Sequence, residues 1–250
     1  MKKSVETIYG VHAVRALLLR RPERILRVRL AAGRDDPRVR ELCELASRHG
    51  LPIERAEARE FKQLLGEVVH QGVMAEIDAL PAWTEDDLLD ALGGATHPLV
   101  LALDGVQDPH NLGACLRTAD ACGALALVVP KDRAAQLTPT VRKVAAGAAE
   151  TTPVVAVTNL VRCLTLLKQA GLWVVGAESQ ANKRAQDVDL RTGTVLVLGA
   201  EGAGLRQLTR QSCDFLVRLP QLGAVESLNV SVAAGMLLYE AVRQRDAGLA

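Results

Sequence analysis

Three stretches of the chain carry polar side chains and glycines at spacings that could bind and orient a ligand. The first contains Asn111 and Arg117, six residues apart. The second runs from Gly199 to Gly204 and has three glycines within six residues, so its backbone can take positive φ and approach a ligand closely. The third, Ser227-Leu-Asn229, puts two small polar side chains just ahead of an apolar segment. These residue types predict a ligand site built from three parts of the chain.

Arg117 indicates which chemical group the ligand carries. We expect it to lie on a helix face of apolar and small residues (Leu116, Ala119 and Ala121), where an unpaired cation is costly and a phosphate would pair with it. A salt bridge to Asp108 or Asp120 is the alternative. Asn111, near the expected start of a helix, has its own alternative role as the N-cap of that helix.

Two short strands and one helix would position these residues. Thr194 to Leu198 is too short for a helix and rich in β-branched residues, which favours a buried strand that ends at the glycine stretch. A second strand is expected over 215–219, where Pro220 stops it. An apolar helix is expected over 230–242, directly after Asn229. Two strand ends and a polar helix entry therefore meet at one place.

The chain from residue 98 onward alternates strand and helix. This alternation predicts a parallel sheet covered by helices on both faces. The expected strands before residue 194 are 99–103, 124–129, 154–157 and 173–176, and the expected helices are 111–122, 139–146 and 160–170.

The first 77 residues predict a smaller α/β unit that could fold alone. A linker is expected over 78–97, with one short helix capped by Thr84 and ending at Leu92. The second domain is expected over 98–250. The N-terminal elements expected are strands at 25–30, 53–56 and 73–77 and helices at 10–20, 37–50 and 60–65.

Positive charge is concentrated at the N-terminal end. Residues 1–40 carry eleven Lys and Arg against four Asp and Glu, although the whole chain has a net charge of only +1. This excess indicates either a surface that binds a polyanion or a solvated arginine-rich face. Arg27 and Arg29 share one face of the strand expected at 25–30.

Composition argues against several classes of protein. The five cysteines are dispersed, with no C-x-x-C spacing, which favours reduced thiols over a disulfide framework or a zinc site. No apolar run approaches the roughly 20 residues that a bilayer requires, and no signal peptide is recognisable. We therefore expect a cytoplasmic protein with no membrane segment and no metal.

A dinucleotide-binding fold, as in an NAD-dependent dehydrogenase, is the first functional alternative. Its fingerprint would place glycine where Gln207 stands. Its glycine loop also follows the first strand of the sheet, whereas here only 46 residues follow Gly204. Both features count against this alternative.

The three motifs resemble those of a known family. Asn111-Leu-Gly-Ala-x-x-Arg117, Gly-Ala-Glu201-Gly-x-Gly204 and Leu-Pro220 followed by Ser227-Leu-Asn229 occur in the same order in SpoU-type RNA ribose 2'-O-methyltransferases of the SPOUT class. His70-Gln-Gly-Val73 and the N-terminal segment extend the resemblance over nearly the whole chain.

The resemblance implies an α/β fold with a deep trefoil knot in the C-terminal parallel-sheet domain, S-adenosyl-L-methionine bound there, and a homodimer formed through the knot region. It also implies an RNA-binding N-terminal domain of the ribosomal-protein L30e type, over 1–77, and a catalytic domain over 98–250. The implied reaction is methylation of the ribose 2'-hydroxyl of a guanosine in the peptidyl-transferase loop of 23S rRNA, free or in a large-subunit precursor. A tRNA ribose methyltransferase of the same family and a non-enzymatic RNA-binding module are the alternatives.

The resemblance also assigns roles to residues. Catalytic and substrate-facing roles fall on Asn111, Arg117, Glu201, Ser227 and Asn229, and cofactor contacts fall on Gly199, Glu201, Gly202, Leu219 and Leu228. Arg117 would be either the proton acceptor or a clamp on the target phosphate. Because a guanidinium stays protonated in proteins, we favour the clamp.

Overall fold

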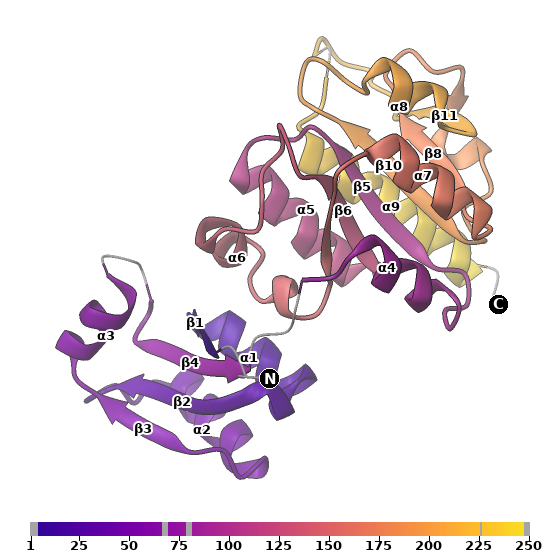
Figure 1. Cartoon of the computed structure of the whole chain (residues 1–250). Helices are drawn as coiled ribbons and strands as arrows, with labels where there is room; N and C mark the ends of the chain where they lie inside the picture. The colour runs from indigo at the N-terminus through magenta and orange to yellow at the C-terminus, as the bar shows by residue number, and fades with distance from the viewer. Residues whose placement is uncertain (1–4, 67–69, 79–81, 226, 248–250) are drawn as a thin grey trace. The chain divides into compact units, whose positions relative to one another are not determined.

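Two β sheets, one of four strands and one of seven, organise the residues that the structure describes (Figure 1). The structure is a computed structural model that describes residues 5–66, 70–78, 82–225 and 227–247. The chain divides into two compact units. The first comprises Met1–Pro81 and Ala146–Thr151, and the second comprises Ala82–Ala145 and Thr152–Ala250. No described helix is long and apolar enough to cross a membrane.

The sheet of the first unit has the strand order β1-β4-β2-β3. Only β2 and β3 run parallel, and the other neighbours are antiparallel. Asp36 caps α2, because its carboxylate accepts the N–H groups of Arg38 and Val39. The unit contains β1 (Val5–Tyr9), α1 (Val11–Arg20), β2 (Ile25–Ala31), α2 (Pro37–Arg48), β3 (Ile53–Ala56), α3 (Ala58–Leu65) and β4 (Val73–Asp78).

Arg27 and Arg29 do share one face of β2, but carboxylates neutralise them there. Arg27 contacts Glu54 at 3.1 Å and Glu76 at 3.0 Å. Arg29 contacts the same two carboxylates at 2.9 and 2.7 Å. The excess positive charge of residues 1–40 is therefore not displayed on this strand face.

The seven strands of the second sheet are all parallel, in the order β7-β6-β5-β10-β8-β11-β9. This confirms the predicted parallel sheet. The sequence does not predict the two-residue strand β9 or the five-residue helix α8. The unit contains α4 (Glu85–Leu92), β5 (Leu99–Asp104), α5 (Pro109–Ala121), β6 (Ala126–Pro130), α6 (Pro139–Val144), β7 (Val154–Val157), α7 (Leu160–Gln169), β8 (Trp173–Ala177), β9 (Lys183–Arg184), β10 (Thr194–Gly199), α8 (Gln207–Gln211), β11 (Phe215–Arg218) and α9 (Val230–Ala247).

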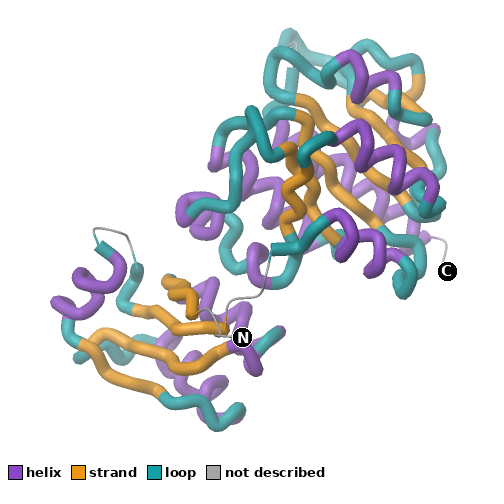
Figure 2. Tube along the Cα trace, viewed as in Figure 1, coloured by secondary structure: helices purple, strands orange, loops and turns teal. Residues whose placement is uncertain are grey.

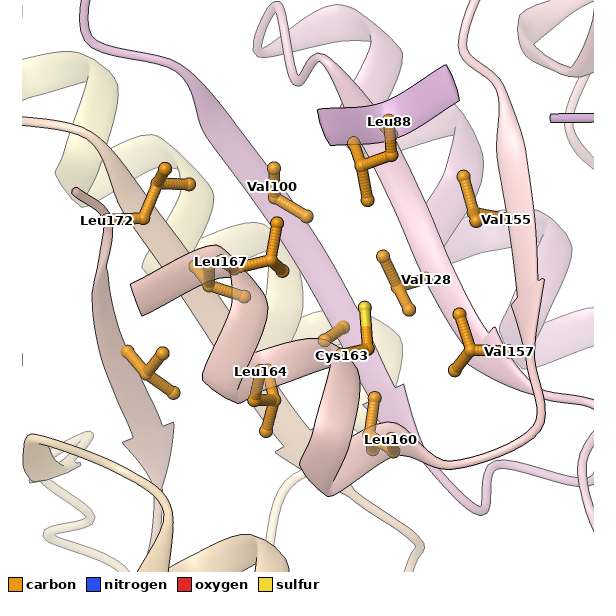
Figure 3. Close-up of a cluster of buried hydrophobic side chains, with 14 of the residues drawn as sticks. Leu88, Val100, Val128, Val155, Val157, Leu160, Cys163, Leu164, Leu167 and Leu172 are labelled. Atoms are coloured by element: carbon orange, nitrogen blue, oxygen red, sulfur yellow. The ribbon is translucent and has the colours of Figure 1, made fainter. Parts of the chain in front are cut away.

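Helices cover both faces of this sheet (Figure 2). One group consists of α4, α7 and α8, and the other consists of α5, α6 and α9. Figure 3 shows Leu160, Leu164 and Leu167 of α7 pointing at the strands, where they join a buried cluster with Val100 and Val128. Burial of one such aliphatic side chain contributes about 1.5–3 kcal/mol. The sheet edge that carries the polar motifs is therefore fixed from both faces.

Gly113 sets the close packing of α5 against α6. A Cβ at this position would lie 2.6 Å from the Cβ of Val144 and 2.9 Å from the carbonyl oxygen of Val141. Only glycine lets the two helices approach this closely. The packing fixes the path of α5, the helix that carries Asn111 and Arg117.

We expect Gly113→Ala to lower the free energy of unfolding by about 1–3 kcal/mol, the usual cost of overpacking. Gly235→Ala in α9 is the matched control, because a Cβ there meets only Thr118 Cγ2, at an ordinary 3.6 Å. The control should be neutral or stabilising by up to about 1 kcal/mol, because alanine favours a helix over glycine. Urea denaturation measures both variants, and equal effects would contradict the packing argument.

Candidate active site

The three sequence motifs meet at the carboxyl edge of the parallel sheet. The last residues of β5 and β10, Asp104 and Gly199, are paired in register. The loop after β5 leads into α5, and the loop after β11 leads into α9. Because parallel strands all end at the same edge, Asn111, Glu201 and Asn229 are brought to one place.

Asn229 is the centre of a hydrogen-bond network at this edge. Its side-chain nitrogen donates to Asn111 Oδ1 at 2.9 Å and to Glu201 Oε1 at 3.0 Å. Its side-chain oxygen accepts the backbone N–H of Ser231 at 2.9 Å and the Ser231 hydroxyl at 2.6 Å. Sequence reasoning missed Ser231, although a serine two residues after Asn229 has the spacing of an Asx turn.

These four hydrogen bonds use the full capacity of the Asn229 amide, which has two donors and two acceptor lone pairs. The side chain therefore has a single orientation. Among the described residues, the amide nitrogen of Asn111 and the Oε2 atom of Glu201 have no partner. The network thus presents one donor and one acceptor whose positions are fixed by Asn229.

Asn111 is not the N-cap of α5. The helix begins at Pro109, and the carboxylate of Asp108 accepts the backbone N–H of His110 at 2.9 Å. Asn111 lies inside the first turn, where its side chain is available to Asn229. The N-cap interpretation of Asn111 is therefore wrong, because an aspartate three residues earlier already satisfies the helix start.

Arg117 is exposed, so the expectation that it lies on an apolar helix face is also wrong. The buried face of α5 consists of Leu112, Gly113, Cys115, Leu116 and Ala119. Arg117 forms no ion pair within the described part of the chain, and the alternative salt bridge to Asp108 or Asp120 is not formed. Its charge stays in water and is available to an anion from solution.

Gly199 makes the second motif possible. A Cβ on Gly199 would overlap the carbonyl group of Gly204, so only glycine lets the loop fold back on the end of β10. The loop is closed by a hydrogen bond from the Gly204 N–H to the Ala200 carbonyl, 2.9 Å long. Gly202 and Gly204 have φ values of 74° and 66°, and a Cβ on either would meet no atom within 4 Å. Their backbone is therefore open to a ligand.

The remaining predicted residues do not join the hydrogen-bond network. Leu219 follows the last residue of β11, and Leu219 and Leu228 are half-buried. Ser227 is exposed and makes no hydrogen bond to another described residue. The structure thus links Asn111, Glu201 and Asn229 by hydrogen bonds and leaves Arg117 and Ser227 outside them.

Metal and thiol chemistry have no support at this edge. No group of three His, Cys, Asp or Glu side chains that could hold a metal ion occurs in the described ranges. Burial raises the pKa of the Cys115 thiol, inside the first motif, to about 12. The thiol is therefore protonated near neutral pH and is a poor nucleophile.

Comparison with protein families assigns both parts of the chain. Residues 98–239 match the SpoU rRNA Methylase family. Residues 7–83 match a family described as RNA 2'-O ribose methyltransferase substrate binding.

Individual proteins support the same assignment. The 23S rRNA (guanosine-2'-O-)-methyltransferase RlmB of Pseudomonas syringae pv. tomato is 57% identical over 246 residues, 97% of each chain. Among solved structures, the SpoU methyltransferase AviRb of Streptomyces viridochromogenes in complex with the cofactor AdoMet has 27% identity and a TM-score of 0.76, covering 98% of this chain and 92% of AviRb. The A. aeolicus TrmH/SpoU tRNA modifying enzyme has 31% identity and a TM-score of 0.56, covering 66% of this chain and 85% of its own.

The family match spans more than half of the chain, in the same region where the three motifs converge on the carboxyl edge of the sheet. The resemblance that the motifs indicate is therefore confirmed, and the chain belongs to the SpoU rRNA methylase family.

Proposed function

We propose that this protein transfers a methyl group from S-adenosyl-L-methionine to the ribose 2'-hydroxyl of a guanosine in the peptidyl-transferase loop of 23S rRNA. The observation that carries the chemistry is the saturated Asn229 amide, which holds Asn111 and Glu201 at one point. The substrate class follows from relatives named 23S rRNA guanosine methyltransferases, which match nearly the full chain. The tRNA modifying enzyme covers only 66% of this chain, so it gives less support to a tRNA substrate than these relatives give to 23S rRNA.

The glycine loop suits the proposed cofactor. The open backbone at Gly202 and Gly204 offers N–H and C=O groups without side chains in front of them. Leu219 and Leu228 supply half-buried apolar surface, and with Gly199, Glu201 and Gly202 they form the proposed cofactor set. When bound, S-adenosyl-L-methionine supplies an electrophilic methyl group on a sulfonium. The deep trefoil knot implied by the family resemblance stays a prediction.

The network can orient the ribose hydroxyl. Glu201 Oε2 can accept the 2'-hydroxyl hydrogen, and the Asn111 amide can donate to the hydroxyl oxygen. Ser227, exposed beside Leu228, is proposed to contact the same ribose. Methyl transfer from a sulfonium to an oxyanion annihilates charge, so it is favoured when both groups are aligned and water is kept out.

Arg117 is proposed to bind the phosphate next to the target ribose. Its guanidinium is exposed, has no carboxylate partner among the described residues, and lies six residues from Asn111 on the same helix. Guanidinium groups bind phosphate oxygens in pairs, and their positive charge would stabilise the developing alkoxide.

We expect the wild-type protein to methylate a 23S rRNA transcript at one guanosine 2'-hydroxyl, read out by tritium incorporation and primer extension at low nucleotide concentration. Arg117→Ala should lower the rate of the chemical step roughly a hundredfold or more, the usual cost of losing a transition-state donor. Arg117→Lys should retain part of the rate, because an ammonium keeps the charge without the bidentate geometry.

Neither change should alter cofactor affinity or melting temperature, because Arg117 supports no described structural contact. A Lys variant as inactive as the Ala variant would contradict the clamp and favour proton transfer or geometry. A transcript that stays unmethylated while a tRNA is methylated would contradict the proposed substrate.

The glycine loop can be tested separately. We expect Gly199→Ala to abolish S-adenosyl-L-methionine binding, because a Cβ there forces the carbonyl of Gly204 away and opens the loop. Gly223→Ala is the matched control, since it lies in open space without a positive φ. Titration calorimetry measures both, and unchanged affinity in Gly199→Ala would remove this loop from the cofactor site.

The N-terminal unit is proposed to bind RNA, with 1–77 as the L30e-type substrate-binding domain, 78–97 as the linker and 98–250 as the catalytic domain. The family match over residues 7–83 supports the RNA-binding role. Because β2 neutralises Arg27 and Arg29 internally, exposed arginines elsewhere in this unit, such as Arg20, Arg21 and Arg38, are the proposed phosphate contacts. A cytoplasmic location follows from an rRNA substrate.

A homodimer is also proposed. Val232, Met236 and Tyr239 of α9 repeat at helical spacing and are 51%, 45% and 67% exposed. An apolar stripe of this kind commonly marks a protein interface. In a two-fold dimer each residue of the stripe occurs twice, so one substitution alters both halves of the interface.

We expect Met236→Glu to weaken self-association by about 3 kcal/mol, because the interface would bury two unpaired carboxylates. Leu64→Glu is the control, an equally exposed leucine in the first unit at 53%. Sedimentation equilibrium separates the two, and a Met236→Glu dimer as tight as wild type would place the interface elsewhere.

A further inference from the structure

A cavity lies at the carboxyl edge of the large sheet, and no residue of the network around Asn229 lines it. Its volume is about 510 Å³, within the range of small-molecule sites. Its lining includes Asp104, Arg133, Thr158, Asn159, Arg206 and Leu208. None of these residues belongs to the proposed catalytic or cofactor set.

Asp104 is the feature that points to a ligand. Its side chain is fully buried, at 0% exposure, yet it lines the cavity. Oδ2 accepts the backbone N–H of Arg206 at 2.9 Å. Oδ1 has no hydrogen bond to any described residue, and Arg206 Nε lies 3.5 Å away. The ion pair with Arg206 leaves this buried oxygen without a hydrogen bond, so a donor from a ligand would stabilise it.

One side of the cavity offers a place for an anion. Arg133 is an exposed cation at its rim with no carboxylate partner among the described residues, whereas Arg206 is ion-paired with Asp104 and the exposed Asp132 adds a negative charge. The helix α7 also begins there, with its positive dipole end. The wall is braced, since the Lys131 N–H donates to the Val157 carbonyl and the Ala135 N–H to the Val106 carbonyl, both at 2.8 Å. A ligand that combines a hydrogen-bond donor with phosphate charge fits these groups, and a nucleotide has both.

The cavity and the catalytic network lie on different helix layers. Asp104, α7 and α8 belong to the cavity, whereas Asn111 and Asn229 introduce α5 and α9, which cover the other face of the sheet. The loop 199–206 connects them, with Glu201 hydrogen-bonded in the network and Arg206 fixed on Asp104. A nucleotide in the cavity is therefore not the one whose ribose is methylated.

We propose that this cavity holds a splayed-out nucleotide of the RNA that neighbours the methylated guanosine, with its base donating a hydrogen bond to Asp104 Oδ1 and its phosphate on Arg133. This proposal rests on the proposed function. Sequence-specific RNA recognition commonly unstacks single bases into pockets of this kind, and guanidinium planes can stack on them.

The test uses RNA hairpins of the methylated 23S rRNA loop in which each nucleotide flanking the target is made abasic in turn. For the full-length protein, one abasic position should weaken binding about tenfold, measured by fluorescence anisotropy. Asp104→Asn should weaken the intact hairpin by a similar factor, because its amide oxygen keeps the Arg206 N–H bond but an N–H₂ donor replaces the acceptor. Asp104→Asn should bind that abasic hairpin only slightly more weakly than the wild-type protein binds it.

Two further variants keep the test decisive. Asp132→Asn removes the same charge from the exposed rim of the cavity and should not weaken binding. Thr158→Trp puts a large side chain at an exposed position of the cavity lining, should block the cavity, and should reproduce the tenfold loss with an unchanged melting temperature and unchanged cofactor affinity.

Two outcomes would overturn the nucleotide pocket. One is that Thr158→Trp binds the intact hairpin as tightly as the wild-type protein does. The other is that the losses of affinity caused by the abasic position and by Asp104→Asn multiply when the two are combined. A wild-type protein that methylates no 23S rRNA would instead contradict the proposed function, so the two failures are distinguishable.

Discussion

The missing side chain of Gly199 is the constraint on which the rest of the site depends. Because the carbonyl of Gly204 occupies the space of a Cβ, the chain leaving β10 can fold back at once instead of continuing along the strand. Asp104, the register partner of Gly199 on β5, then holds the far end of the loop through the Arg206 N–H. With both ends fixed, Glu201 projects at the position where Asn229 can reach it. The parallel sheet supplies the two adjacent strand ends, and glycine supplies the turn between them.

Much of this architecture can be predicted from the sequence, because the residue patterns of strands and helices are clear where these elements are buried. The strands Ile53–Ala56 and Val154–Val157 and the helix α4 (Glu85–Leu92) occur as predicted. A β-branched run marks the second of these strands, and the capping residue Thr84 marks the start of the helix. The strand β1 was missed because only Ile8 among its five residues is buried, so no alternation is visible. The two-residue strand β9 and the five-residue helix α8 are too short to carry a period.

The candidate site was predictable in its composition but not in its contacts. Parallel strands end at one edge, so the convergence of the three motifs follows from topology. The exposure of Arg117 could also have been found, because at roughly 100° per residue it lies about 140° around α5 from Leu112, away from Cys115, Leu116 and Ala119. The hydrogen bond between Asn111 and Asn229, 118 residues apart, could not, because no local pattern encodes how two loops approach each other.

The saturated amide of Asn229 has a consequence for catalysis. A side chain with four hydrogen bonds cannot rotate when a ligand arrives without breaking at least one of them, at about 1 kcal/mol net or more each. In the proposed reaction, Asn111 and Glu201 would therefore be oriented before the substrate binds, and no reorganisation energy would be spent on them. Donors and acceptors held in advance stabilise a transition state more than flexible ones do. Arg117 is the opposite kind of group, because its side chain is exposed and has no carboxylate partner in the described chain. Its proposed phosphate contact would fix its position only when RNA binds. In the proposed function, the preorganised centre of Asn111, Glu201 and Asn229 would therefore act together with a cation whose position depends on the bound RNA.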